Sequence, residues 1–268
     1  MDKRPVTRFT YNMTRTLIDL TQPLDSNLPV YPGDPPFSSR QSHTVSRDGY
    51  SVHSLSYSSH VGTHVDAPSH FFADGATIDQ LPLSTFILPG LVLDVSHKKA
   101  RECIAWETVE PMADRIHPGI AVLFRTDWSR YWDHTTTTTT TPANSDSKRP
   151  THHYFDHPWL AKDVAEHLLA LGVRVVGTDT MSPDQSPSSP ITSTEGEESN
   201  SDYGFHLSFL GAGGIIVENL TNLDTLLAKQ EAAEPDTEVI VSLLPLKIAG
   251  CDGAPVRAVA SLQPRHVL

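Results

Sequence analysis

The segment that most constrains the fold is His-Val-Gly-Thr-His-Val-Asp-Ala-Pro-Ser-His over residues 60–70. On a strand, His60, His64 and Asp66 would share one face, because alternate side chains point the same way. A straight strand rises about 3.3 Å per residue, which would separate the two histidines by about 13 Å. A metal–nitrogen bond is only about 2.1 Å long. Either the chain bends at Gly62, or the segment holds two ions side by side.

Both arrangements need further ligands, because two or three leave a catalytic ion incompletely coordinated. Glycine tolerates a sharp bend, and a carboxylate such as Asp66 can bridge two ions about 3.5–4 Å apart. His206 and Glu218 are the best additional candidates, since each lies at the end of a predicted element, where sites usually form. Glu218 also follows three apolar residues, and an unpaired carboxylate is costly to bury there. The spacing alone fits a purely structural role for His206 and Glu218 equally well.

Short apolar runs elsewhere predict the elements of the fold. Strands are expected at residues 16–20, 51–59, 87–95, 120–124, 173–177, 214–217, 239–246 and 256–262. Apolar residues at helical spacing predict a helix from Pro158 to Leu171, which Gly172 ends, and a short helix is expected at 205–210. A helix that leads directly into a strand favours an α/β arrangement of layers.

Two segments differ in composition from the rest of the chain. Residues 134–153 include seven consecutive threonines, and residues 182–202 are rich in Ser, Pro and Glu. Neither has enough apolar side chains to order itself by burial. His134, His152, His153 and His157 border the first segment and are interpreted as histidines of a solvated loop. With no internal repeat and no clear linker, the sequence predicts one domain over residues 1–268 with flexible insertions at these two places.

Charge and composition argue against several classes of partner. The formal net charge of −12 disfavours nucleic acid and anionic membranes, because phosphate binding needs clustered Lys and Arg. No apolar run approaches the roughly 18 residues of a spanning helix, and the first residues lack the features of a secretory signal. Cys103 and Cys251 form no C-x-x-C pair, so a thiolate zinc site is not expected. These features predict a cytoplasmic protein.

The twelve residues 60–71, HVGTHVDAPSHF, resemble the H-x-G-T-H-x-D-x-P-x-H-F signature of the cyclase family of metal-dependent hydrolases. That family includes bacterial kynurenine formamidase and isatin hydrolase. The similarity extends to residues 29–34 (PVYPGD), to residues 177–180 (GTDT) and to the surroundings of His206 and Glu218. The resemblance covers about residues 17–259. It implies a compact α/β domain with a β-barrel-like core and outer helices, of the swivelling β/β/α type.

The resemblance also implies roles for individual residues. His60, His64 and Asp66 would bind a first divalent ion, Zn or Mn, and in two-metal members Asp66 would share a second ion with His206 and Glu218. His70 would be the general acid/base. Tyr31 would lie against the substrate, where formamidases carry an aromatic residue that is commonly Trp. A homodimer or homotetramer is implied as well.

Such a site is suited to hydrolysis of an amide-type C–N bond in a small molecule, either an aryl formamide or a cyclic amide. Coordination lowers the pKa of water from about 15.7 to about 7. A positive ion stabilises the developing oxyanion, and an imidazole can protonate the departing nitrogen.

Three other functions deserve comparison. A hydrolase of lactones or esters would need the same groups. A non-catalytic metal-binding or interaction protein on the same fold has no use for a proton shuttle, so His70 argues against it. A metallo-β-lactamase-like site is excluded, because the histidines here are four residues apart rather than two and Ala67 follows Asp66.

Overall fold

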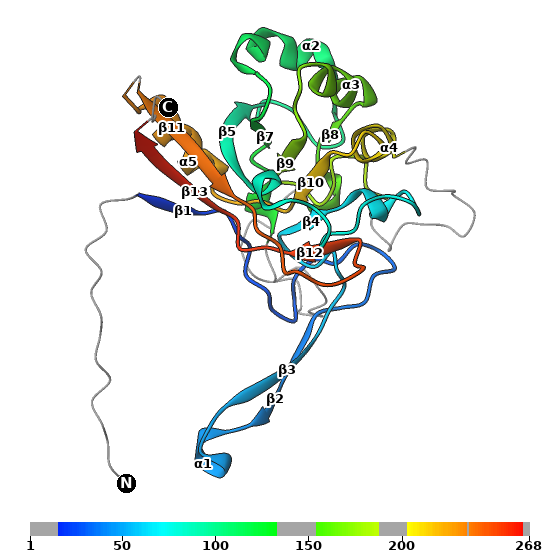
Figure 1. The fold of residues 1–268 in the computed structure, drawn as a ribbon, viewed down its shortest axis with the longest axis vertical. Coiled ribbons are helices and arrows are strands. Elements are labelled where there is room, and N and C mark those ends of the chain that lie inside the picture. Colours follow the sequence, from blue (N-terminus) through cyan, green and yellow to red (C-terminus); the bar gives the residue numbers. More distant parts are fainter. Residues whose placement is uncertain (1–15, 133–153, 188–202, 235, 265–268) are drawn as a thin grey trace, which may run out of the picture.

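The computed structural model describes residues 16–132, 154–187, 203–234 and 236–264, and the rest of the chain lies outside this description. Nine strands form a curled sheet (Figure 1). In spatial order they are β1 (Leu17–Asp19), β13 (Val259–Pro264), β11 (Thr237–Ser242), β5 (Ile87–Asp94), β7 (Ala121–Arg125), β9 (Val175–Thr178), β10 (Ile215–Glu218), β4 (His64–Asp66) and β12 (Gly253–Pro255). The strands β5, β7, β9 and β10 run parallel to one another, whereas the strands at both ends of the sheet pair antiparallel.

Helices cover both faces of this sheet. They are α2 (Trp106–Val109), α3 (Lys162–Ala170), α4 (Gly204–Gly211) and α5 (Leu223–Glu231). Leu123 and Val217 face the hydrophobic cluster that includes α5, whereas their neighbours Val122 and Ile216 face the cluster that includes α3 and α4. Because successive side chains on a strand point to opposite faces, strands buried on both sides read as continuous apolar runs.

Short stretches of 3-10 helix connect several of these elements. They occupy Pro68–His70, Leu83–Thr85, Glu110–Arg115, Trp128–Tyr131 and Tyr154–Asp156. The helix predicted from Pro158 begins later, at Lys162. Its expected first turn instead forms β8 (Trp159–Leu160), which pairs with β6 (Cys103–Ile104). Pairing across the fold therefore overrides the local preference of proline for a helix start.

A two-stranded arm projects from the body of the molecule (Figure 1). It consists of β2 (Ser38–His43), the short helix α1 (Val45–Asp48) at its tip, and β3 (Val52–Ser56). Every residue of β3 is exposed. We refer to residues 38–56 as the arm.

The fold class predicted from the sequence is confirmed: the protein is an α/β structure with a half-barrel sheet and helices outside it. Among the helices described, none combines the length and the hydrophobicity needed to cross a membrane. The threonine-rich segment, residues 134–153, lies outside the described residues. Residues 188–202 also do, but 182–187 are described, and Ser182, Asp184 and Ser186 are buried. The prediction of a flexible segment is therefore wrong for residues 182–187.

Candidate metal centre

The three-residue strand β4 places two predicted ligands beside a third. His64 and Asp66 are two residues apart, so they point to the same face of the sheet. In the register of β10 with β4, Glu218 lies opposite His64. All three side chains are buried, with exposed fractions of 1%, 1% and 7% in the order His64, Asp66 and Glu218. A buried pair of carboxylates requires compensating positive charge.

A sharp bend at Gly62 brings His60 back onto this group. Gly62 has φ of +60°, which glycine adopts without strain, and an added Cβ would clash with Leu24 Cδ2. The bend leaves His60 Nδ1 only 2.7 Å from Asp66 Oδ1. The first of the two arrangements considered from the sequence is thus present, because the chain turns instead of continuing as a straight strand.

Helix α4 supplies His206 from the opposite side of Asp66. Its Nε2 lies 3.5 Å from Asp66 Oδ2 and 3.4 Å from Glu218 Oε1. Asp184 fixes this position, because its carboxylate accepts hydrogen bonds from the backbone N–H groups of Phe205 and His206 and contacts His206 Nδ1 at 2.5 Å. Sequence reasoning missed Asp184, since a single Asp in a Ser- and Pro-rich stretch carries no periodic signal.

The structure therefore brings together all five residues predicted as ligands. They form two groups that share Asp66, one with His60 and His64 and the other with His206 and Glu218. Within each group, the potential ligand atoms lie within 4.8 Å of one another. This geometry is compatible with two neighbouring cations that share one carboxylate.

The hydrogen bonds of the histidines fit a divalent cation. His64 Nδ1 lies 2.8 Å from the Gly62 carbonyl, and His60 Nε2 lies 3.0 Å from Asp252 Oδ2. With His206 held by Asp184, each of the three rings has one nitrogen engaged outside the cluster and directs the other toward carboxylate oxygens. This is the usual environment of metal-binding histidines. His64 Nε2 and Asp66 Oδ2 are buried and make no hydrogen bond within the described part of the chain.

The carboxylates and imidazoles of the cluster shift one another's pKa values. Burial lowers the pKa of His64, but the adjacent carboxylates of Asp66 and Glu218 outweigh burial and raise it to about 10. Burial raises the pKa of Asp66, but the neighbouring histidines outweigh burial and hold this pKa well below the usual range. The carboxylates thus remain ionised and attract either protons on the imidazoles or cations in their place. Because a ligand histidine must give up its proton, metal binding here would release protons.

His70 lies beside the cluster, at the end of the turn Pro68–His70. Its ring centroid is 4.0 Å from that of His60, and its Nδ1 lies 3.3 Å from Asp252 Oδ2. Burial lowers the pKa of His70, and the charge of His60 adds to this effect, although Asp66 acts in the opposite direction. A neutral imidazole at this place can accept a proton and return it.

A cavity of about 420 Å³ opens next to the cluster. Its lining includes five residues of the cluster and its surroundings: His60, His64, His70, His206 and Glu218. Tyr31, Phe71, Met181 and Tyr203 supply apolar and aromatic surface. The hydroxyl groups of Tyr31 and Tyr203 are 3.5 Å apart, and burial raises the pKa of Tyr31, which keeps it a neutral phenol. The size of the cavity suits a small molecule.

Comparisons with known proteins agree with this architecture. A family model described as "Putative cyclase" matches residues 18–185. The kynurenine formamidase of Paracidovorax citrulli (strain AAC00-1) is 33% identical over 253 residues, covering 91% of this chain and 96% of that protein. The kynurenine formamidase of Bacillus cereus (strain ATCC 14579) is 31% identical, with coverage of 92% and 97%.

Solved structures give the same result. Isatin hydrolase A from Labrenzia aggregata, bound to benzyl benzoate, has a TM-score of 0.70 and 25% identity, covering 92% of this chain and 93% of that one. A structure titled as a potential metal-dependent hydrolase with cyclase activity has a TM-score of 0.64 and 24% identity, with coverage of 92% and 98%. His206, Glu218 and Asp252 lie beyond the residues that the family model matches.

Proposed function

The chain belongs to the cyclase family, and on this basis we propose that its site hydrolyses an amide-type C–N bond in a small molecule. The protein is a metal-dependent hydrolase of non-peptide C–N bonds. One observation carries the proposal: two groups of potential ligands share Asp66 beside a cavity that His70 also lines. Three aromatic side chains, which we call the aromatic wall, line the same cavity: Tyr31, Phe71 and Tyr203.

The residues would hold a divalent cation, Zn or Mn, and there is room for one or two ions. We assign His60, His64 and Asp66 to the first ion, and Asp66, His206 and Glu218 to the second. When bound, a divalent cation acidifies water and stabilises negative charge on a carbonyl oxygen. Imidazole nitrogens and carboxylate oxygens are ligands that both metals accept.

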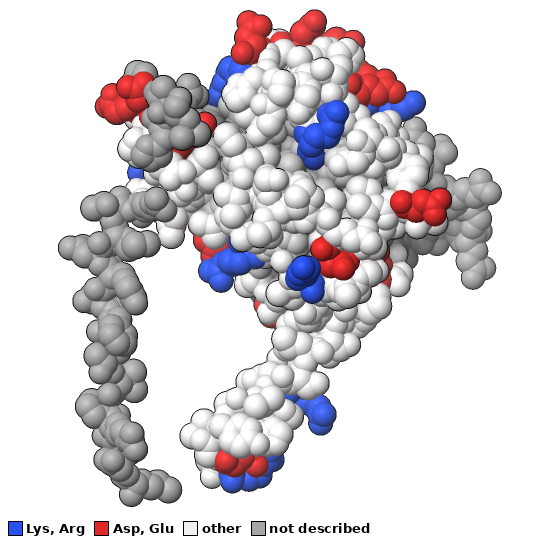
Figure 2. All heavy atoms as spheres, viewed as in Figure 1, with Lys and Arg blue, Asp and Glu red and all other residues white. Residues whose placement is uncertain are grey.

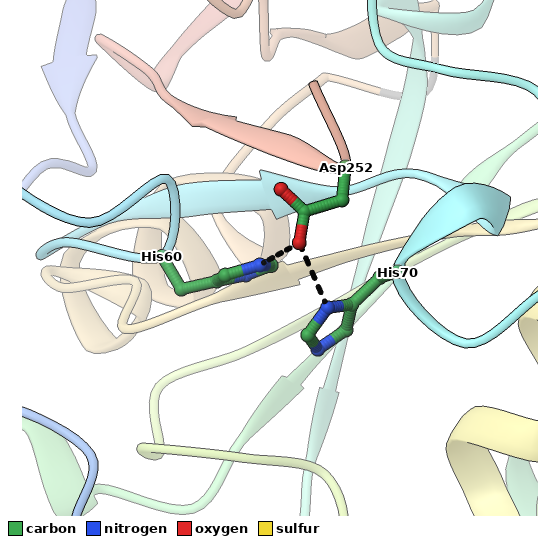
Figure 3. A group of neighbouring side chains, drawn as sticks. All are labelled: His60, His70 and Asp252. Atoms are coloured by element: carbon green, nitrogen blue, oxygen red, sulfur yellow. Dashed lines mark hydrogen bonds and ion pairs between the residues drawn. The ribbon is translucent and has the colours of Figure 1, made fainter. Parts of the chain in front are cut away.

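The chain's own groups supply the remaining requirements of amide hydrolysis. His70 is close enough to the cluster to take a proton from the attacking water and to pass it to the departing nitrogen. Its Nδ1 faces Asp252, and its other ring nitrogen points away from that carboxylate (Figure 3). A positioned acid/base of this kind contributes about 10²–10⁴ to the rate.

The aromatic wall favours a planar ring next to the scissile bond. We propose an aryl formamide or a cyclic amide fused to a ring as the substrate, with Tyr31 against the ring. Replacing Tyr31 with Ala should raise KM by about 10-fold, as expected for loss of a stacked aromatic contact. Tyr31→Phe should change KM little, because the ring remains. Steady-state kinetics on both variants would measure this, and equal KM values for Ala and wild type would remove Tyr31 from the substrate site.

The function is tested by metal analysis of the purified protein together with hydrolysis assays. The panel contains N-formylkynurenine, isatin and simple cyclic amides, with a lactone and an aryl ester for comparison, each with and without chelator. We expect turnover of an amide substrate that chelator abolishes and metal restores. Faster turnover of the esters would favour the lactone or ester hydrolase. A fully metal-loaded protein without any turnover would favour the non-catalytic alternative.

We also propose that the chain assembles with copies of itself, as a homodimer or homotetramer. The arm supports this proposal, because an isolated hairpin is marginally stable in water. It exposes Val52 and Leu55, at 42% and 55%, and carries two arginines and one aspartate in an otherwise acidic chain. A second copy of the acidic body would complement this charge and cover the apolar side chains. Replacing Leu55 with Asp should lower the mass measured by analytical ultracentrifugation, and an unchanged mass would contradict the role of the arm.

The remaining proposals concern location and partners. We propose a cytoplasmic enzyme that acts on a small molecule without binding nucleic acid or membranes. On the face shown in Figure 2, Lys and Arg side chains are scattered and do not gather in a patch. Electrophoretic mobility shift at low salt is the simplest test, and clear retardation of DNA or RNA would contradict this proposal.

A further inference from the structure

We propose that Asp252 is a positioning residue that holds His60 and His70 together in the orientations that hydrolysis requires. This inference rests on the proposed function. A single carboxylate oxygen, Oδ2, lies 3.0 Å from His60 Nε2 and 3.3 Å from His70 Nδ1 (Figure 3). The two imidazole rings are 4.0 Å apart between centroids, so Asp252 bridges neighbouring rings.

The chemistry of a carboxylate determines which nitrogens carry hydrogen. An ionised carboxylate only accepts hydrogen bonds, and Asp252 Oδ2 lies within hydrogen-bond distance of a ring nitrogen of both histidines. His60 must therefore carry its hydrogen on Nε2, which leaves Nδ1 to face Asp66 and a cation. His70 must carry its hydrogen on Nδ1, which leaves Nε2 to exchange a proton with substrate. One group thus sets the tautomer of both a proposed ligand and the proposed acid/base.

The backbone places Asp252 without help from these histidines. The Ala67 N–H donates to the Asp252 carbonyl at 2.8 Å, and the Ile78 N–H donates to the carbonyl of Cys251 at 2.9 Å. On the side chain, Ser59 Oγ donates to Oδ1 at 2.8 Å. Replacing the Asp252 carboxylate should therefore leave the loop around residue 252 in place. The effects of the replacement can then be assigned to the lost hydrogen bonds to His60 and His70.

Asp252 differs from the groups that orient the other two histidines. The Gly62 carbonyl serves only His64, and Asp184 serves His206 and the start of α4. Among the residues that the structure describes, only Asp252 lies within hydrogen-bond distance of both a proposed ligand and His70. We therefore expect loss of the Asp252 carboxylate both to weaken metal binding and to slow the metal-saturated enzyme. A residue that orients only one ligand, or a purely structural residue, would not combine these two effects.

Asp252→Asn, compared with Asp79→Asn, tests the proposal. An amide oxygen in the place of Oδ2 is an uncharged and therefore weaker acceptor for both rings. An amide nitrogen in that place would present hydrogens to both rings. Asp79 is a matched control, because its carboxylate is also bonded to the loop that carries Asp252. It accepts hydrogen bonds from the Gly250 N–H at 2.9 Å and from the Thr77 hydroxyl at 2.7 Å. We expect zinc affinity, measured by competition with a chromogenic chelator, to fall about 10–100-fold in Asp252→Asn. Asp79→Asn should bind zinc as wild type does.

Two further measurements separate positioning from a structural role. At saturating zinc, kcat of Asp252→Asn should fall at least about 10-fold with KM nearly unchanged. In the zinc-loaded protein, ¹⁵N-histidine spectra should place the His70 hydrogen on Nδ1, and Asp252→Asn should shift it toward Nε2. The His70→Gln variant identifies which signals belong to His70.

The outcomes distinguish this proposal from the proposed function. Zinc affinity and His70 signals like those of wild type in Asp252→Asn would overturn the role of Asp252, as would an equal loss in Asp79→Asn. If wild type hydrolyses nothing in the panel, the proposed function fails, while zinc affinity and the spectra still decide the role of Asp252.

Should Asp252→Asn fold poorly, Ser59→Ala removes only the supporting hydroxyl. It should then show a smaller loss of zinc affinity, with the His70 hydrogen still on Nδ1 because the carboxylate remains. Unchanged zinc affinity, or a His70 hydrogen on Nε2, would overturn the proposal.

Discussion

The metal centre and the interior region around residue 157 each enclose a histidine that is 1% exposed. Around His64, burial lowers the pKa but Asp66 and Glu218 raise it to about 10. Around His157, burial lowers the pKa to about 4, and the close partners are neutral: the Pro158 carbonyl at 2.9 Å and Ser186 Oγ at 2.7 Å. Burial by itself therefore does not make a reactive histidine, because adjacent carboxylates decide whether the ring attracts a cation.

The largest expected difference between the two regions is in metal binding. Removing His64 takes a nitrogen from a group of three proposed ligands, so His64→Ala should lose its metal and all metal-dependent turnover. We expect an affinity loss larger than the roughly 10–100-fold that follows from changing a hydrogen-bond partner of a ligand. His157→Gln should keep wild-type metal content by inductively coupled plasma mass spectrometry. Equal metal content in the two variants would contradict the claim that the region around His64 binds metal and the region around His157 does not.

His70 is intermediate between these two histidines, because it is partly exposed and bonded to one carboxylate, Asp252. His70→Ala should keep the metal, since none of the five proposed ligands is changed. Turnover should fall by about 10²–10⁴, the usual contribution of a positioned acid/base. Substrates with better leaving groups should show a smaller deficit. A variant that loses its metal would make His70 a ligand, and normal turnover would remove it from the mechanism.

The smallest expected effect is on the pH dependence of stability. His157 has a folded pKa of about 4, below the unfolded value of about 6.5. Between these values the unfolded chain binds more protons, so the free energy of unfolding decreases as the pH falls below about 6.5. At pH 5 the loss should reach about 2 kcal/mol relative to pH 7.5.

Urea unfolding of the metal-free proteins can measure this contribution. His157→Gln lacks the titrating ring, so its stability should depend less on pH, and the difference between the two proteins should change by about 2 kcal/mol between pH 7.5 and pH 5. Comparing the same two proteins at both pH values cancels contributions from all other groups. A constant difference would show that the ring of His157 is not desolvated as the structure indicates.

Much of the centre could be predicted from local sequence. The spacing of His60, His64 and Asp66 required either a bend or two ions, and Gly62 with its φ of +60° provides the bend. His206 and Glu218 were expected at the ends of a helix and a strand, and both lie there. These predictions succeeded because backbone angles and strand periodicity depend on residues that are near one another in the chain.

Other features became visible only in the folded chain. His157 was interpreted from its neighbours in the sequence as a loop residue, but it is buried. Asp184 and Asp252 were not recognised, although they orient His206, His60 and His70. Strand β12 was missed as well, because its three residues include Gly253 and Pro255 and show no strand pattern.

Side-chain chemistry and short-range periodicity were enough to predict the types of the candidate ligands, their local geometry and the α/β class. Which histidines meet carboxylates depends on the folded chain. Asp252 reaches His60 across 192 positions because β12 pairs with β4 at the edge of the sheet. Contacts of this kind depend on the order of the strands, and strand order reflects the packing of the whole core, which no local pattern in the sequence records.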